Sequence, residues 1–368
     1  MENACLLPIS IVGALMPDAH LGYGLPIGGV LATEAAVIPY AVGVDIACRM
    51  KMTILDMPVS FISEQADKLK NAISRETSFG IGASFKKRKQ HSVMDENWNF
   101  SPVTKRLKDK AWSQLGTSGS GNHFVEFGTL TLEKDALGLT AGIYLALLSH
   151  SGSRGTGNEV ATHYSKLAMD SHQELPNELR RLAWLDLKSN IGAEYWQAME
   201  LMGRYAAANH QLIHRSIAKN LAAEVLCDIE NHHNFAWKET FDGRNVIVHR
   251  KGATPAGKND IGIIPGSMAT PGYVIAGRGN RDSLNSASHG AGRKMSRKAA
   301  KRQFDWHYAN QLLTERRVTL ISAGLDEVPM AYKDIESVMN AQNDLVEKIA
   351  RFDPKIVKMA RGDQRPED

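Results

Sequence analysis

The pattern of hydrophobic and polar positions predicts two blocks of strands separated by a long helical region. Residues 49–57, RMKMTILDM, alternate polar and apolar positions, as expected for a half-buried strand. GNHFVEFG (121–128) and TAGIYLALLSH (140–150) also predict strands, each with a histidine near one end. Short strands return between residues 244 and 324, among glycine-rich turns.

Helical periodicity is found in three places. Residues 60–76 predict a first helix, and residues 158–232 predict a helical insertion that is broken near Pro176. Within the insertion, apolar side chains recur at every fourth position and define one helix face: Ile213, Ile217, Leu221 and Val225. Residues 331–350 predict a closing helix whose inner side carries Ile335, Val338, Leu345 and Ile349. The prediction is an α+β fold with mixed and antiparallel sheets, in a single domain spanning residues 1–368.

Composition agrees with a soluble globular protein, because 43% of the 368 residues are hydrophobic and 23% are charged. No apolar run reaches the ~18–20 residues that span a bilayer. The three cysteines (Cys5, Cys48 and Cys227) are odd in number and widely spaced, which favours a reducing compartment. We therefore expect a cytoplasmic protein. Its net charge of +4 is compatible with a polyanionic partner.

The most basic stretch is SFKKRKQHS (84–92), which has no apolar stripe of its own. It predicts a solvated surface loop, with a nucleic-acid contact as the alternative.

Several segments carry side chains that bind metals. Asp45 and Cys48 are three residues apart in GVDIACRM and can direct a carboxylate and a thiolate at one place, although a buried structural cysteine is the simpler interpretation. Histidines also occur in turns at predicted strand ends, which converge in a sheet: His20, His123, His150, His232 or His233, and His289. Imidazole and thiolate ligands suit Mn, Fe, Co or Zn, and a shared Cys48 thiolate would permit two-metal catalysis on a phosphate.

Glycine-rich segments suggest where a phosphate would bind. GTSGSGNHFVE and IIPGSMATPGY can bring backbone N–H groups close to an anion. GATPAGKN (252–259) has Asn259 where a phosphate-binding P-loop requires Ser or Thr, which argues against that motif. In SASHGAGRKMSR, His289 precedes two glycines and three cations (Arg293, Lys294 and Arg297). The segment predicts either a histidine nucleophile beside a phosphate or a buried histidine at a close turn.

Eight motifs occur together in a recognisable order: MPDAHLGYGLPIGGVLAT, AVGVDIAC, GSGNHFVE, HSGSRGTG, HHN, VHRKGATPAG, IPGSM and SHGAGRKMSR. On these motifs the chain resembles the RtcB family of RNA-splicing and RNA-repair ligases, and in particular a shorter, divergent branch of it. The resemblance extends from about residue 7 to 300, with a weaker match at the C-terminus.

The resemblance implies a GTP- and Mn²⁺-dependent ligase, acting in RNA repair or tRNA splicing. Such an enzyme joins an RNA 3′-phosphate or 2′,3′-cyclic phosphate to a 5′-hydroxyl end, and a protein partner that activates it or takes part in repair is compatible with this role. It implies that Cys48 bridges two ions, with His123 and His150 on one and Asp45 and His233 on the other. His289 would accept GMP, and Arg154 and the cations after His289 would hold phosphates. The guanylate-binding residues that it implies are Asn122, His123, Phe124, Val125, Glu126, His233, Asn234, Pro265, Gly266, Ser267, Met268, Gly272, His289, Gly290, Ala291, Gly292 and Lys358.

The chain departs from the family pattern at Ala47 and Arg49 beside Cys48, at Gly272 in place of a serine, at His210 in place of an arginine, and after Lys358. Two alternative functions follow from the same residues. One is a two-metal RNA phosphatase or nuclease that needs no GTP, and the other is a non-catalytic RNA-binding paralogue.

Overall fold

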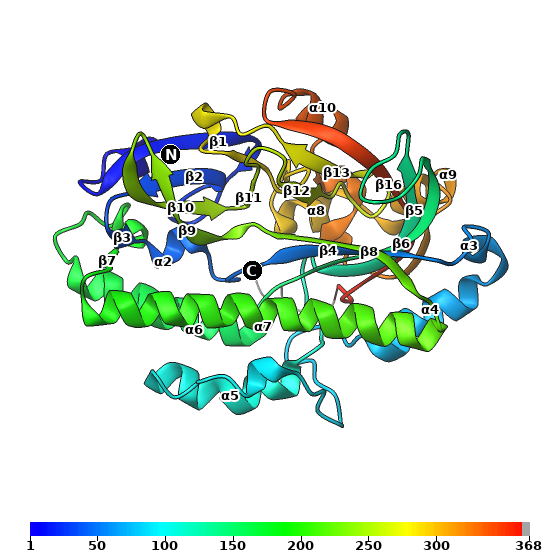
Figure 1. Ribbon diagram of the computed structural model, residues 1–368, viewed down its shortest axis with the longest axis horizontal. Helices are drawn as coiled ribbons and strands as arrows, with labels where there is room; N and C mark the ends of the chain where they lie inside the picture. Colours follow the sequence, from blue (N-terminus) through cyan, green and yellow to red (C-terminus); the bar gives the residue numbers. More distant parts are fainter. Residues whose placement is uncertain (363–368) are drawn as a thin grey trace.

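Two β-sheets form the body of the protein, seen in the computed structural model of residues 1–362 (Figure 1). The last six residues of the predicted 1–368 domain lie outside the described part. The larger sheet has the strand order β12-β13-β16-β5-β6-β4-β8, with β15 beside β16. These strands span Ile261–Ile264, Gly272–Gly277, Val346–Met359, Phe124–Leu132, Gly142–Ser151, Arg49–Leu55, Val225–His232 and, for β15, Thr319–Ser322. Only the β15–β16 pair is parallel among the strand pairs of this sheet in residues 1–362, which confirms a mixed sheet.

The second sheet has the order β1-β2-β10-β9. Its strands span Ser10–His20, Ile27–Thr33, Arg244–Lys251 and Asn234–Phe241. Two small pairs complete the strands: β11 (Ala253–Pro255) with β14 (Ser286–Ser288), and β3 (Ala36–Val37) with β7 (Leu185–Asp186).

A helical layer covers one side of the larger sheet, with the 32-residue helix α7 (Asn190–Leu221) running along it (Figure 1). α6 (Arg154–Ser171) and α4 (Ala66–Glu76) pack against α7, and α5 (Pro102–Gln114) packs against α6. The remaining helices are α1 (Glu2–Cys5), α2 (Pro39–Val42), α3 (Phe61–Glu64), α8 (Arg297–Gln303), α9 (Trp306–Glu315) and α10 (Ile335–Asn340). The predicted helix over 60–76 is confirmed, as are the strands at 124–132 and 142–151.

The predicted helical insertion is correct in its middle and wrong at its end. Ile213, Ile217 and Leu221 are buried on one face of α7, as the spacing predicts. α7 ends at Leu221, and Val225 begins strand β8, where its side chain is 49% exposed. The segment VLCDIENH pairs along its whole length with β4, so tertiary pairing overrides the apparent helical spacing.

Two other expectations need correction. β4 is buried at all seven positions rather than at every second one, because α7 covers one face and the apolar cluster around Met52 covers the other. Its cations Arg49 and Lys51 are matched by Glu230 (3.4 Å) and Asp228 (3.0 Å) on the neighbouring strand β8. The closing helix is limited to Ile335–Asn340, and Val346–Met359 forms the central strand β16 instead. Residues 350–355, ARFDPK, alternate between buried and partly exposed positions, a strand pattern that the four-residue periodicity around Ile349 conceals.

The described residues contain no helix that is both long enough and apolar enough to cross a membrane.

Candidate metal and nucleotide site

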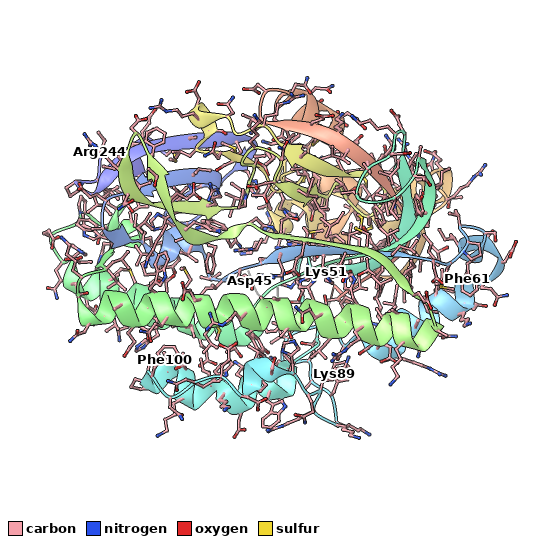
Figure 2. The ribbon with its side chains drawn as sticks, in the orientation of Figure 1. Asp45, Lys51, Phe61, Lys89, Phe100 and Arg244 are labelled. Atoms are coloured by element: carbon pink, nitrogen blue, oxygen red, sulfur yellow. The ribbon has the colours of Figure 1, made fainter. Side chains whose placement is uncertain are left out.

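A cleft of about 860 Å³ is lined by residues from both large sheets. It brings together parts of all eight motifs, which are up to 277 residues apart in sequence, from His20 to Arg297. Asp45, near the middle of the molecule in Figure 2, lies on the cleft wall between α2 and β4. The strand ends therefore converge as the sequence predicts.

Five predicted metal ligands meet at one end of this cleft. The Sγ of Cys48 lies 3.1 Å from the Nε2 of His150 and 3.5 Å from the Nε2 of His123. The Nε2 of His123 lies 3.0 Å from Oδ2 of Asp45, and the Nε2 of His150 lies 3.2 Å from the Nε2 of His233. Cys48, His123 and His150 are buried and offer ligand atoms within 4.8 Å of one another. The Cys48 sulfur lies between His123, which also contacts Asp45, and His150, which also contacts His233.

The backbone fixes these side chains in place. Asp45 and Cys48 lie in a turn that leads into β4, and the carbonyl oxygen of Cys48 accepts a hydrogen bond from the backbone N–H of His233 (3.0 Å). Gly152 has to be a glycine, because a Cβ there would lie 2.0 Å from Oδ1 of Asp45. The neighbouring backbone N–H of Ser153 donates to the same oxygen atom. The chain thus holds the carboxylate before any metal binds.

The tautomer of His150 is determined by its outer hydrogen bond. Its Nδ1 donates to the carbonyl oxygen of Asn122 (3.0 Å), which leaves the lone pair on Nε2 facing Cys48 and His233. Burial lowers the pKa of His150 to about 3 and that of His233 well below its usual range. Neutral imidazoles and a thiolate converging on one point form a donor set suited to a borderline divalent cation.

His289 lies next to this cluster, with its ring 4.9 Å from that of His233 between centroids. Its Nδ1 donates to Oδ2 of Asp18 at 2.7 Å, and the backbone N–H of His289 donates to the same oxygen (3.2 Å). Asp18 is fully buried. Because the carboxylate accepts a hydrogen bond from Nδ1–H and keeps the proton on Nδ1, the lone pair of His289 is on Nε2, which is the state that a nucleophile needs. Sequence reasoning missed Asp18, although the quoted motif MPDAHLGYG contains it.

The glycines after His289 make room mainly for the strand that carries Asp18, and less for a ligand. Gly292 has φ +74°, and a Cβ there would lie 2.2 Å from the carbonyl oxygen of Asp18. Only a glycine lets the strand that carries Asp18 approach so closely. Gly290 has more room, since its nearest neighbour would be the Pro265 carbonyl oxygen at 3.4 Å.

Most of the expected guanylate-binding residues line the cleft. Those on its walls are Asn122, Phe124, Glu126, His233, Asn234, Pro265, Gly266, Ser267, Met268, Gly272, His289, Gly290, Ala291 and Gly292. Asn234 connects two segments that line the cleft. Its side-chain oxygen accepts a hydrogen bond from the backbone N–H of Gly252, and its side-chain nitrogen donates one to the carbonyl oxygen of Asp45. His123 does not line the cleft, but its Nε2 contacts Asp45 and Cys48, which do.

Val125 and Lys358 lie elsewhere. They face each other on β5 and β16, where Phe124 and Val357 face the cleft instead. Val125 is fully buried in a separate apolar cluster, and the Nζ of Lys358 lies 5.4 Å from the centre of the Phe79 ring. The alternation of strand side chains therefore directs both away from the cleft.

The cations expected to hold phosphates are differently placed. Arg154 is buried, and its NH1 lies 3.1 Å from Nδ1 of His123, so it braces the glycine-rich loop and does not line the cleft. Arg293 and Arg297 line the cleft but pair with Glu327 there. Lys294, which is exposed, and Lys251 also line it. Burial, followed by the nearby Arg181, lowers the pKa of Lys251 to about 8.

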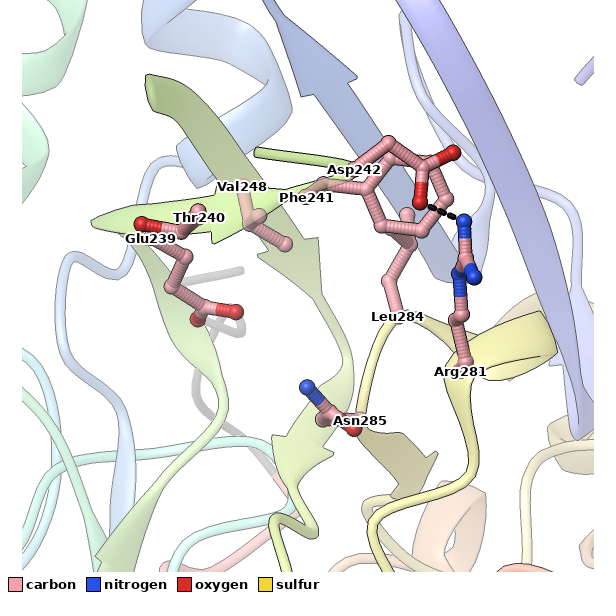
Figure 3. Close-up of a pocket in the computed structure, with 8 residues that line it drawn as sticks. All are labelled: Glu239, Thr240, Phe241, Asp242, Val248, Arg281, Leu284 and Asn285. Atoms are coloured by element: carbon pink, nitrogen blue, oxygen red, sulfur yellow. Dashed lines mark ion pairs between the residues drawn. The ribbon is translucent and has the colours of Figure 1, made fainter. Parts of the chain in front are cut away.

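A second, smaller cavity of about 310 Å³ lies beside the β9–β10 hairpin (Figure 3). Asp242 and Arg281 form an ion pair at one side of it, and Glu239 and Asn285 lie on the other (Figure 3). None of the predicted site residues lines this cavity.

The fold and the site define an α+β protein with a buried Cys/His cluster able to bind metal. A family model described as tRNA-splicing ligase RtcB matches residues 1–360. The chain is 34% identical to the RNA-splicing ligase RtcB of Escherichia coli strain K12, over 91% of this chain and 87% of that protein. It is 32% identical to the tRNA-splicing ligase RtcB of Nanoarchaeum equitans, over 97% and 90%, and 29% identical to that of Thermococcus kodakarensis, over 96% and 88%. The chain belongs to the RtcB family.

Proposed function

We propose that the protein is a GTP- and Mn²⁺-dependent RNA ligase that joins a 3′-phosphate or 2′,3′-cyclic phosphate end to a 5′-hydroxyl end. The observation that supports this most strongly is the position of His289. Its Nε2 keeps a lone pair because Asp18 accepts a hydrogen bond from Nδ1–H at 2.7 Å, and the ring lies beside the His233 ring of the Cys/His cluster. A two-metal phosphatase or nuclease attacks with a metal-activated water and does not require a histidine nitrogen as nucleophile.

In the first step, Nε2 of His289 attacks the α-phosphorus of GTP. A nitrogen–phosphorus bond forms as the bond to the pyrophosphate oxygen breaks, and pyrophosphate leaves with the electron pair. Asp18 stabilises the positive charge that develops on the ring. Lys251 and Lys294 on the cleft wall are the cations available to the phosphates.

Asp45, Cys48, His123, His150 and His233 would hold two Mn²⁺ ions, with the Cys48 thiolate shared between them. When bound, these ions would supply Lewis-acid polarisation of the phosphate oxygens. The thiolate can be shared because it already lies between His123 and His150, at 3.5 and 3.1 Å.

Glu126 is suited to recognising guanine. Its side chain lines the cleft, and burial raises its pKa well above the usual value. Donors of a bound base that hydrogen-bond to the ionised carboxylate would favour that form and offset the effect of burial. Guanine presents two adjacent donors, N1–H and the N2 amino group, which a single carboxylate can accept. Adenine lacks this pair of donors, so Glu126 would favour GTP over ATP. Glu126→Gln should weaken that preference.

The later steps transfer GMP to RNA. An oxygen of the RNA 3′-phosphate attacks the phosphorus on His289, the nitrogen–phosphorus bond breaks, and neutral His289 is regenerated. The 5′-hydroxyl of the second RNA then attacks the activated 3′-phosphate, loses its proton and expels GMP. A cyclic phosphate must first be opened to a 3′-phosphate.

A joining assay tests the proposal. Paired oligonucleotides with 3′-phosphate and 5′-hydroxyl ends should be joined only when Mn²⁺ and GTP are both present, and His289→Ala should not join them. Loss of the 3′-phosphate without GTP, and unchanged in His289→Ala, would instead show the two-metal phosphatase. Binding of RNA without any change at its ends would show the non-catalytic paralogue.

A further inference from the structure

Loop 84–92 and helix α5 carry a group of exposed cations that the proposed chemistry does not use. α5 buries Val103, Leu107 and Ala111 against the other helices, so its outer face presents the charged positions. Lys86 and Lys87 are exposed in the loop, and Lys105 is exposed on α5. Figure 2 labels Lys89 and Phe100 along this edge of the molecule, beyond α7. We call the outer face of α5 and this loop the cationic ridge.

The ridge keeps an excess of positive charge after its own ion pairs are formed. Residues 84–110 contain eight Lys or Arg residues and three Asp or Glu residues. The acidic side chains nearby are used by a few of the cations: Asp109 pairs with Arg88, and Glu159 pairs with Arg106 and Lys110. Four lysines pair with no carboxylate of residues 1–362: Lys86, Lys87, Lys105 and Lys108. A solvated face of mixed charge would not leave so many of one sign.

The loop that presents these lysines is anchored. The Arg88 guanidinium stacks 5.3 Å from the centre of the Trp112 ring, and it also pairs with Asp109 at 3.2 Å. The Nζ of Lys89 lies 4.2 Å from the centre of the Phe85 ring and donates to the Glu76 carbonyl oxygen at 2.9 Å. Of the four cations in the loop, Arg88 and Lys89 thus hold it against α5 and α4, and Lys86 and Lys87 face solvent. A surface that is fixed before binding loses less conformational entropy when a partner binds.

The ridge is joined to the metal site through a short stretch of chain. α5 ends at Gln114, and His123 follows nine residues later, so the end of the ridge lies within about 30 Å of the cluster. The start of the loop is also tied to this stretch, because the N–H of Gly80 donates to the carbonyl oxygen of Gly119 at 2.7 Å. A nucleic-acid duplex covers this distance in roughly ten base pairs.

We infer that the cationic ridge binds the phosphate backbone of the substrate RNA, outside the cleft that would hold the ends to be joined. This inference rests on the proposed function. A polyanion with regularly spaced phosphates matches unpaired lysines that are presented by the loop (Lys86 and Lys87) and by α5 (Lys105 and Lys108). Between residues 84 and 114 no large apolar side chain is exposed, which favours a nucleic acid over insertion into a lipid surface.

The test is a binding measurement that needs no catalysis. A hairpin RNA of about 30 nucleotides with a 3′-hydroxyl, which cannot be joined, is titrated by fluorescence anisotropy without GTP between about 50 and 200 mM salt. Changing Lys86, Lys87, Lys105 and Lys108 together to Gln should weaken binding about tenfold or more and reduce the salt slope by about 3. The matched control changes four exposed lysines elsewhere to Gln: Lys166, Lys188, Lys238 and Lys258.

Two further measurements distinguish a failure of the inference about the ridge from a failure of the proposed function. The ridge variant should keep wild-type labelling of the protein by GTP and wild-type joining of short oligonucleotides, while its KM for the long RNA rises. Equal losses of RNA binding in both variants, or unchanged binding in the ridge variant, would overturn the inference. Loss of binding to anionic phospholipid vesicles with RNA binding unchanged would also overturn it, in favour of a membrane surface. A wild-type protein that binds RNA through the ridge but takes no label from GTP would refute the proposed function and leave the ridge as an RNA-binding surface.

Discussion

At the scale of single residues, the account depends on one pair, Asp18 and His289. The fully buried carboxylate accepts from both the ring Nδ1 and the backbone N–H of His289, and it thereby fixes the ring's tautomer and its orientation. Gly292 permits this contact because no other residue could lie against the Asp18 carbonyl oxygen at φ +74°.

Asp18→Asn should slow the labelling of His289 by about 10²- to 10⁴-fold. The amide nitrogen of the new side chain can donate to Nδ1, which moves the ring proton to Nε2 and removes the attacking lone pair. The rate of labelling should fall while the KM for GTP changes little, as single-turnover kinetics would measure. An unchanged rate would mean that Asp18 only supports the fold.

Nucleotide binding should weaken as the pH rises through about 8, because of Lys251. Its pKa is lowered to about 8 in the free protein by burial and by Arg181, and a bound phosphate favours the charged form and so raises the pKa. Affinity is therefore greatest below pH 8 and declines above it. Lys251→Arg keeps its charge and should give a flat profile from pH 7 to about 9.5. Titration calorimetry with GTP measures both, and a flat wild-type profile would contradict the assignment.

The sequence singled out the residues that meet in the Cys/His cluster better than the residues that support them. Asp45, Cys48, His123 and His150 could be proposed from their chemistry and their turns taken together, whereas His233 was chosen over His232 only by the family resemblance. Asp18 could not be singled out, because a carboxylate in a strand gives no sign of a partner 271 residues away. Arg154 was expected to bind phosphate, but its burial beside His123 depends on the packing of α6.

At the scale of elements, the site depends on strands β4 and β6 and on the helix that covers them. Cys48 directly precedes β4 and His150 lies near the end of β6, and these two strands pair directly, with Met50 opposite His150. α7 packs against both strands. β8 extends the sheet on the other side of β4 and brings His232 opposite Arg49, which places the following residue, His233, near Cys48.

The boundary between α7 and β8 can be tested by two truncations. Ile217 is fully buried on α7, so Ile217→Ala should reduce the free energy of unfolding by about 2–5 kcal/mol. Val225 is half exposed on β8, so Val225→Ala should reduce it by less than about 1 kcal/mol. Urea denaturation measures both. Equal losses would support a continuous helix face through residue 225.

Helices and strands were predicted correctly where the apolar residues followed one periodicity, and were missed where the spacing suited both a helix and a strand. The spacing of Ile213, Ile217 and Leu221 gave α7 correctly. The same spacing extended falsely to Val225, and around Ile349 it concealed a strand. Both segments pair with strands that are distant in sequence, and no local pattern carries that information.

At the scale of the whole molecule, the two sheets enclose one cleft that contains both the metal cluster and His289. The cationic ridge lies outside the cleft, on the helical layer, so the ends of an RNA and its body would contact different elements. The α+β class and the mixed sheet followed from two blocks of strand patterns on either side of a helical region. The position of the central strand β16 did not, because it is set by pairing with β5, β13 and β15.

The most direct measurement of the central claim is covalent labelling of the protein by GTP carrying a labelled α-phosphate, in the presence of Mn²⁺. The wild type should take up label, His289→Ala should take up none, and His233→Ala should take up little. His232→Ala is the matched control, because this ring lies against Phe235 and Trp237 rather than in the metal cluster, and it should label like the wild type. A folded wild-type protein that takes no label, or a His289→Ala variant that still does, would contradict the account.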